Sequence, residues 1–309
     1  MIIKLKNNKI LVNSFKVIVL IAAYGYMYIK FKDIEFKVIF EFNNYLYLFL
    51  ALLLMPLNWL IESRKWQLLI SNFEIISIYT SFKAVLSGLT TSIFTPNRVG
   101  EFVGRIMYIS SENRVKATFS TILGSYSQIL ITLIIGSFSV LFIKQGNICF
   151  IDNNIYLKWS FLVFTFLLIT LFFSLSKFIF IFNKMNNKYI RSIISTASGY
   201  SSFDLVKLMF LSLIRYFVFY TQFYLLLQFF SIDISIFESF ITIGIFYLFL
   251  MFIPTFVISE PGVRISTSIL VFSVFVEDVS LVVYTVSLLW IINIVLPTII
   301  GSVFFVRQK

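Results

Sequence analysis

The sequence of 309 residues contains no histidine and a single cysteine, Cys149. Without histidine there is no imidazole to act as a general base or to bind zinc or haem. A lone cysteine forms neither a CxxC redox pair nor an internal disulfide. We therefore expect no metal, no redox centre and no cofactor in this protein.

Charged side chains are also scarce. They make up 13% of the residues, compared with about 25% in ordinary globular domains. Hydrophobic residues make up 59% of the chain, and the mean hydropathy is +0.95. Because a water-soluble domain needs polar side chains to cover its surface, most of this surface must face hydrocarbon. The composition predicts one integral membrane domain over residues 1–309, with no soluble domain.

The uncharged runs predict where the chain crosses the membrane, because a lipid-spanning helix needs about 20 apolar residues. Six runs qualify: Phe42–Ile61, Ala117–Ile143, Trp159–Ser176, Tyr216–Ile232, Ser239–Ser259 and Val279–Val306. A seventh run, Ile10–Ile29, contains only Lys16, which can snorkel to the interface. We expect it to be an uncleaved first span.

Two apolar runs are shorter and adjoin a proline and charged residues: Ala84–Asn97 and Ile265–Val276. Runs of about 10 to 14 residues are typical of re-entrant or broken helices, which need protein or water around their free backbone groups. We expect the first to dip into the membrane and return, and the second to cross as a short span. The predicted fold is an all-α polytopic membrane helix bundle of about eight transmembrane helices with one or two broken or re-entrant segments.

The distribution of charge sets the orientation. This topology leaves five of the 25 Lys and Arg residues outside, namely Lys30, Lys32, Lys37, Lys144 and Lys158. By the positive-inside rule we predict the plasma (inner) membrane, with both termini cytoplasmic. The basic inner face would attract anionic lipid. Since the basic residues are scattered over short loops, no nucleic-acid partner is expected.

The segment from Ser92 to Arg105, SIFTPNRVGEFVGR, carries chemistry. Thr95 can cap a helix whose first residue is Pro96. Spacings of three and four then place Arg98, Glu101 and Arg105 on one face, where Glu101 can pair with both arginines. A helix start beside Arg98 predicts an anion site suited to a phosphate head group. The alternative is that these charges only end a hairpin at the inner interface.

A second segment, ISEPGVRISTS from Ile258 to Ser268, repeats this pattern of a break, an acid and an arginine. Transporters often bind substrate where paired interrupted helices meet. We therefore predict one clustered head-group site inside the bundle. Its candidate binding residues are Arg98, Glu101, Arg105 and Arg264, and the structural breaks are Pro96, Gly100, Pro261 and Gly262.

Other polar residues in the spans have simpler interpretations. Arg215 is expected to snorkel to lipid phosphate, or else to line the same site. The in-span amides are expected to bond neighbouring helices, and three tryptophans are expected in the interfacial aromatic belt. These residues are Gln128, Gln222, Gln228 and Asn293, and Trp59, Trp66 and Trp159.

Three runs of the sequence resemble a known family: NWLIESRKWQLL (58–69), TPNRVGEFVGR (95–105) and SEPGVRIS (259–266). Together they are similar to the lysylphosphatidylglycerol synthase transmembrane region, also called the flippase-like family. Pro96, Gly100, Glu101 and Arg105 match its Pro, Gly, Glu, Arg pattern, and Pro261, Gly262 and Arg264 fall at its second break. Many members carry an acid after that break, whereas here Glu260 precedes the proline.

The resemblance implies an integral membrane protein built as an inverted repeat, which translocates lipids or lipid-linked glycans without covalent catalysis. Its partners would be membrane lipids, either an anionic phospholipid or a polyprenyl-linked head group, and self-association stays open. In fused members a separate soluble domain attaches the amino acid, so we do not expect lysyl transfer by this chain.

Two alternatives from other classes stay open. A polyprenyl-dependent membrane glycosyltransferase would use paired acids in the first external loop, where Asp33 and Glu35 lie between Lys32 and Lys37. The chain could also be a non-catalytic subunit of a cell-envelope assembly complex.

Overall fold

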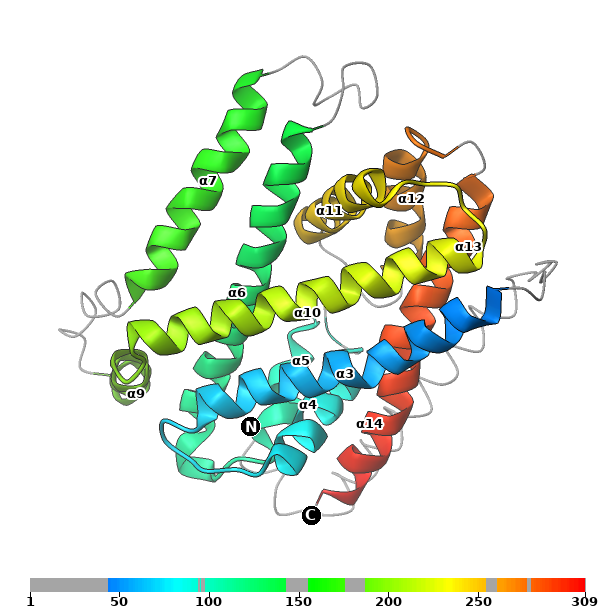
Figure 1. Ribbon diagram of the computed structural model, residues 1–309. Coiled ribbons are helices and arrows are strands. Elements are labelled where there is room, and N and C mark those ends of the chain that lie inside the picture. The colour runs from blue at the N-terminus through cyan, green and yellow to red at the C-terminus, as the bar shows by residue number, and fades with distance from the viewer. Residues whose placement is uncertain are drawn as a thin grey trace.

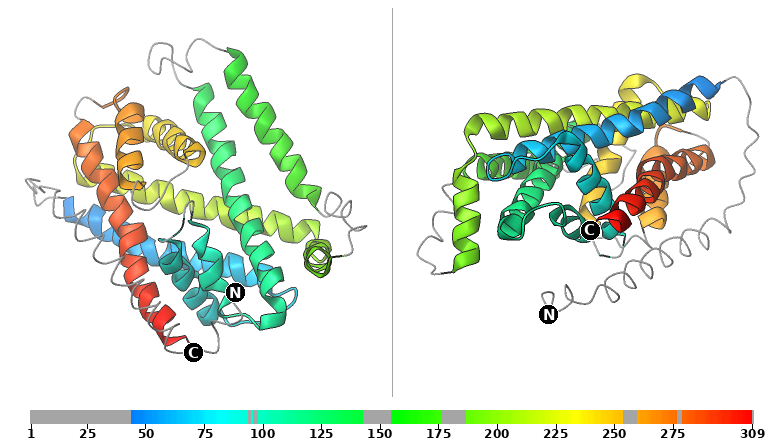
Figure 2. Two further views of the ribbon diagram at one scale, coloured as in Figure 1. Left: turned by 180° about the vertical axis from the view of Figure 1, so that it is seen from behind. Right: turned by 90° about the horizontal axis from the view of Figure 1, so that it is seen from below.

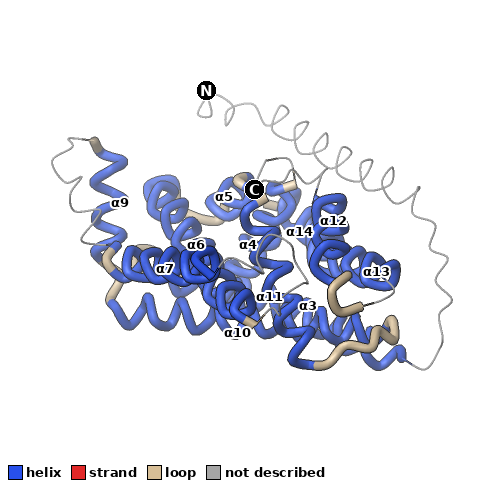
Figure 3. Tube along the Cα trace, turned by 90° about the horizontal axis from the view of Figure 1, so that it is seen from above, coloured by secondary structure: helices blue, strands red, loops and turns tan. Residues whose placement is uncertain are grey.

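The computed structural model describes residues 44–93, 95, 98–142, 155–175, 187–253, 260–276 and 279–308. Within these ranges the chain is helical and has no β-strand, which confirms the all-α class (Figure 1, Figure 3). Three helices are long and apolar enough to cross a membrane: Tyr45–Ile70, Ser111–Leu141 and Val279–Arg307. The predicted first span, Ile10–Ile29, lies outside the described residues, and eight spans are not shown.

The first half of the described chain contains α3 (Tyr45–Ile70), α4 (Ile78–Ser92), α5 (Gly100–Ile106), the short helix η3 (Ser111–Asn113), α6 (Arg114–Leu141) and α7 (Ile155–Phe173). The second half contains α9 (Lys188–Ser198), α10 (Ser202–Phe229), α11 (Ile236–Phe252), α12 (Glu260–Phe272), α13 (Val279–Trp290), η5 (Ile291–Val295) and α14 (Leu296–Arg307).

Helices α3 and α10 lie side by side and antiparallel (Figure 1). Hydrogen bonds join them along their whole length. Asn44 at the start of α3 donates to the Gln228 carbonyl, Gln222 donates to the Ala51 carbonyl at 2.8 Å, and Tyr200 before α10 donates to the Leu69 carbonyl. Helix α6 and the stretch from α13 to α14 run across this pair, and α7 packs beside α6 (Figure 1, Figure 2). The α3–α10 pair is therefore the support for the buried charges described below.

Several helices continue through charges that the uncharged runs would place at span ends. Helix α3 runs nine residues beyond Ile61 and carries Glu62 and Lys65 inside it, both buried. Helix α10 starts at Ser202 rather than near Tyr216, because Ser201 and Asp204 form a capping box there. Uncharged runs indicate which residues can face hydrocarbon, but hydrogen bonds and ion pairs decide where each helix begins and ends.

The predicted run Val279–Val306 is one continuous helical stretch with a π-helical turn, η5. At this turn the Leu296 N–H donates to the Ile291 carbonyl, five residues back. Pro297 follows directly and has no N–H to donate, so the carbonyl four residues before it loses its α-helical partner. The wider turn accommodates this loss and places Asn293 in the core.

Helix α4 is held between α5 and α14 by backbone contacts at glycines. A Cβ on Gly104 would lie 2.5 Å from the Gly88 Cα and 2.5 Å from the Ser87 carbonyl oxygen. On the other side, a Cβ on Gly301 would overlap the Leu86 carbonyl. Such close approach fixes the short α4–α5 hairpin, which is the segment expected to be re-entrant.

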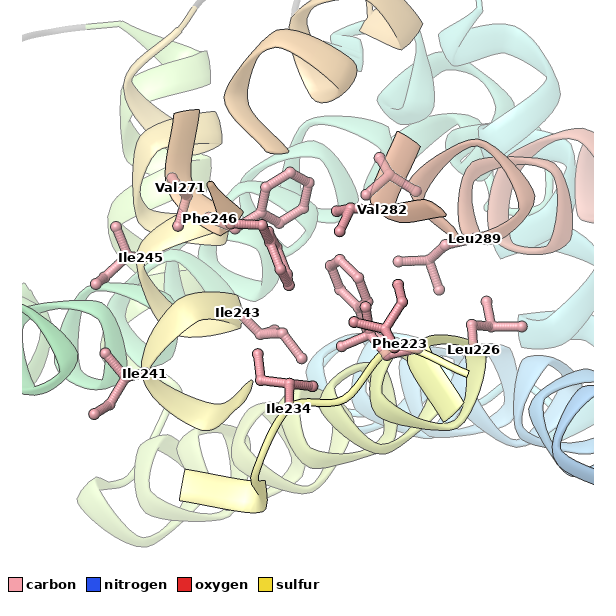
Figure 4. Packing of buried hydrophobic residues seen from close by; sticks show 14 of the residues in the cluster. Phe223, Leu226, Ile234, Ile241, Ile243, Ile245, Phe246, Val271, Val282 and Leu289 are labelled. Atoms are coloured by element: carbon pink, nitrogen blue, oxygen red, sulfur yellow. The ribbon is translucent and has the colours of Figure 1, made fainter. Parts of the chain in front are cut away.

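The largest apolar core joins α10, α11, α12 and α13 (Figure 4). Its centre is the Phe223 ring, whose centroid is 5.4 Å from that of Phe246 and 5.5 Å from that of Phe272. Large apolar side chains also cover the outside of the helices, for example Leu46, Phe166 and Phe210. An outer surface of this kind suits hydrocarbon better than water.

We predict that Gly104→Ala destabilises the protein by about 1–3 kcal/mol, because the new methyl group meets backbone that cannot move aside. Gly262→Ala is the matched control. It lies in the first turn of α12 with nothing within 4 Å of the added atom, so it should be neutral or stabilising by up to about 1 kcal/mol. Thermal unfolding of the purified protein measures both, and equal shifts would contradict the tight helix crossing.

A second prediction concerns Glu74, in the loop after α3. Burial opposes its charge, but bonds from Asn113 and from the hydroxyl and N–H of Ser110 hold the pKa of this carboxyl below its usual value. Its stabilising effect should therefore be complete near neutral pH and disappear as the pH falls below about 4. The difference in melting temperature between wild type and Glu74→Gln should shrink on acidification, and a constant difference would contradict it.

Candidate functional site: two buried charge clusters

Glu62 on α3 accepts bonds from three cations. Its carboxylate lies 2.8 Å from Arg105 Nη2, 2.9 Å from Arg215 Nη1 and 3.0 Å from Lys65 Nζ. Glu62 is 5% exposed, Lys65 1% and Arg105 2%. An isolated charge at such a depth would be far too costly, so the four groups are held as a unit. Together with Glu101, which pairs with Arg105, they form what we call the Glu62 cluster.

Tryptophan rings lie beside the two arginines of the Glu62 cluster. The guanidinium of Arg105 lies 6.0 Å from the Trp66 ring, and that of Arg215 lies 5.5 Å from the Trp59 ring. Both tryptophans are buried, so their assignment to the interfacial belt is wrong, whereas Trp159 is exposed as that assignment requires. A Trp at the end of an apolar span has the same sequence pattern whether it lies at the membrane interface or packs against a buried arginine.

Arg215 does not snorkel outward. Its Nε donates to Asn58 Oδ1 at 2.8 Å and its Nη1 to Glu62. Asn58 then donates to Asn293, and Asn293 donates to Gln222 Oε1 at 2.7 Å. The prediction that in-span amides bond neighbouring helices is confirmed for Gln222 and Asn293, and also for Gln128, which donates to the Ser212 carbonyl. A chain of polar groups thus crosses from α10 through the π turn to the cluster.

The second cluster is centred on Glu260, at the start of α12. Its Oε1 accepts from Arg98 Nη2 at 2.7 Å, from Arg264 Nη2 at 2.8 Å and from Arg264 Nε at 2.9 Å. The Glu260 side chain is 7% exposed, whereas Arg98 and Arg264 are 33% and 18% exposed. We call Arg98, Glu260 and Arg264 the Glu260 cluster.

The helix expected to begin at Pro96 begins instead at Gly100. Pro96 itself lies outside the described residues, and Arg98 has a φ of 58°, in the left-handed region. The N-cap residue of α5 is Val99 instead of the predicted Thr95, although Thr95 Oγ1 accepts from the Gly100 N–H. Arg98 is consequently not on the face that holds Glu101 and Arg105, and it pairs with Glu260 rather than with Glu101.

The four predicted binding residues therefore divide between two clusters. Glu101 and Arg105 belong to the Glu62 cluster, while Arg98 and Arg264 share Glu260. The clusters adjoin along the chain, because Arg98 and Glu101 are only three residues apart. Of the predicted breaks, Gly100 opens α5 against the Thr91 carbonyl, whereas Pro261 and Gly262 lie inside the first turn of α12.

Sequence reasoning missed Glu62 and Lys65 and gave Glu260 no role. The predicted span ends at Ile61, so Glu62 and Lys65 would lie just beyond it. Their spacing of three residues inside NWLIESRKWQLL was a usable signal, since such a pair shares one helix face between two apolar stretches.

Positive charge exceeds negative charge in the two clusters. Three acids, Glu62, Glu101 and Glu260, face five bases, Lys65, Arg98, Arg105, Arg215 and Arg264, so the net charge is 5 − 3 = +2. Among the described residues, no group of acids, Cys or His has the geometry to hold a metal ion. The arrangement can bind an anion.

No family model, curated protein or solved structure matches this chain.

We predict that Glu62→Gln destabilises the protein by about 3–5 kcal/mol, because it leaves buried cations without their shared counter-charge. Adding Lys65→Gln should recover part of the loss, since one unpaired cation is removed. Glu112→Gln, at an exposed acid in η3, is the control and should change stability by less than about 0.5 kcal/mol. If Glu62→Gln melts like the control, the cluster does not hold α3, α5 and α10 together.

Proposed function

We propose that this protein translocates a lipid or a lipid-linked glycan across the plasma membrane, and that it does so without covalent catalysis. One observation carries the proposal: charged side chains with an excess of positive charge are buried between apolar helices. Ionisable groups inside membrane proteins commonly mark the path of a polar substrate. An anionic head group needs such a path to pass the hydrocarbon region.

The arrangement of the broken segments supports this function. Arg98 precedes α5 in the first half of the chain, and Glu260 and Arg264 open α12 in the second half. Both arginines nevertheless donate to the Glu260 carboxylate. Transporters with paired interrupted helices bind substrate where the two breaks meet. The resemblance to the flippase-like family points to the same class of cargo.

The exposure of the side chains assigns different roles to the two clusters. Arg105 and Lys65 are buried and bonded to acids, so we assign them to holding the helices together. Arg98 and Arg264 are partly exposed and share one carboxylate. The head group would therefore contact Arg98 and Arg264, and Arg105, which was also a candidate binding residue, would hold the helices together.

We further propose eight spans with cytoplasmic termini, in which Lys188 faces the cytoplasm and Asp33, Asp152 and Glu277 face outside. In this topology α3 runs inward and α10 outward, and their antiparallel packing agrees with it. The substrate would be an anionic phospholipid or a polyprenyl-linked head group.

Reconstituted vesicles test the proposal. A fluorescent anionic lipid placed in the inner leaflet should reach an external quencher faster with the wild type than in empty vesicles. Arg98→Ala and Arg264→Ala should each slow this step about tenfold, since a charge-assisted bond contributes roughly 1.5–3 kcal/mol.

Arg64→Ala is the matched control, because Arg64 is exposed and its partner among the described residues is Gln67 on its own helix. It should leave the rate unchanged. Equal rates for wild type, arginine variants and empty vesicles across a panel of lipids would count against translocation. Loss of sugar transfer from a polyprenyl donor on Asp33→Asn would favour the glycosyltransferase.

A further inference from the structure

The Glu260 cluster has the chemistry of an occupied anion site. We infer that Arg98 and Arg264 bind the phosphate of a singly charged phosphodiester lipid, and that the Glu260 carboxylate fills this site when no lipid is bound. The inference rests on the proposed function and deepens it, because it names the head-group chemistry and the residue that competes with it.

The hydrogen bonds of the cluster show why a phosphate can replace the carboxylate. All three guanidinium bonds end on a single oxygen, Glu260 Oε1, at 2.7–2.9 Å. A phosphodiester shares one negative charge between two non-bridging oxygens, so each arginine can bond one of them, and arginine forks match phosphate well. The phosphodiester can therefore replace the bonds that both arginines make to Oε1, and the cost of the exchange is that the buried Glu260 carboxylate gives up these bonds.

The charge of the cluster selects the ligand. Glu260 carries one negative charge against two arginines, so the cluster has a net charge of 2 − 1 = +1, and a singly charged phosphodiester neutralises it. A zwitterionic head group carries no net charge and leaves this excess of positive charge in place. The site should consequently prefer phosphatidylglycerol to phosphatidylcholine.

The two arginines are also the accessible members of the network. Arg98 is 33% exposed and Arg264 18%, whereas the Glu260 side chain beneath them is 7% exposed. Arg98 is held in the left-handed backbone conformation, which arginine adopts rarely and which the surrounding structure must maintain. With this backbone conformation the Arg98 side chain bonds Glu260 of α12 and not Glu101. The pair of Arg98 and Glu260 therefore forms only when residues from both halves of the chain meet.

The test is equilibrium binding of a fluorescent phosphatidylglycerol to the full chain in phosphatidylcholine nanodiscs. Glu260→Gln removes the competing charge and should tighten binding about tenfold or more. Arg98→Gln and Arg264→Gln should each weaken binding by about the same factor. Combining Glu260→Gln with Arg264→Gln should abolish the gain.

Glu112→Gln is the control for loss of one negative charge, since Glu112 is exposed in η3, and it should bind as the wild type does. If Glu260→Gln does not fold, Glu260→Asp takes its place. The shorter carboxylate reaches the two arginines less well and should give a smaller gain. Binding by a folded Glu260 variant that is no tighter than wild type overturns the inference.

Translocation measured on the same variants separates the two proposals. Tighter binding by Glu260→Gln with no translocation by any variant would remove the proposed function and leave the site. Translocation by the wild type without that tighter binding would remove the exchange and leave the function. Displacement of the fluorescent lipid by an equal concentration of inorganic phosphate would overturn the assignment to a lipid head group.

Discussion

The free energy of burying charge is the constraint on which this structure depends. Glu62, Lys65 and Arg105 are removed from water, and in that setting each is tolerable only while its partners stay in place. Because those partners come from α3, α5 and α10, the cluster specifies how three helices sit relative to one another. Apolar packing alone does this poorly, since one apolar face is much like another to a neighbouring apolar helix. The ion pairs therefore fix the relative positions of these helices, in addition to the binding role proposed for the charged residues.

The glycine contacts serve the same arrangement. Helix α5 carries Arg105, and it can bring that side chain to Glu62 only if it lies close against α4. The near contact of Gly104 with Gly88 allows that approach, and Gly301 lets α14 close on the opposite side of α4. Small residues at such crossings are typical of helices packed in membranes. Backbone proximity and charge pairing are thus linked in one short hairpin.

The two clusters differ in a way that matters for function. In the Glu62 cluster, Glu62, Lys65 and Arg105 are buried and each cation has an acid partner, which suits a permanent support. The Glu260 cluster has two partly exposed arginines on one carboxylate oxygen, with Arg98 in an unusual backbone conformation. Rare backbone conformations are often found where a structure must present a group for binding. Under the proposed function, the Glu62 cluster would hold the helices in place while the Glu260 cluster binds a head group and then releases it.

The long uncharged runs by themselves predicted the all-helical class, since apolar runs of about 20 residues have the length of a lipid-spanning helix. The sequence also identified Arg98, Glu101, Arg105 and Arg264 as candidate site residues, because charged residues beside interrupted apolar runs commonly have a functional role. Only the tertiary structure decided their partners. The pairing of Arg98 with Glu260 spans 162 positions, and no local spacing rule reaches that far. Glu62 and Lys65 looked like the end of a span because burial depends on what packs around a helix, and periodicity within one helix cannot reveal its neighbours.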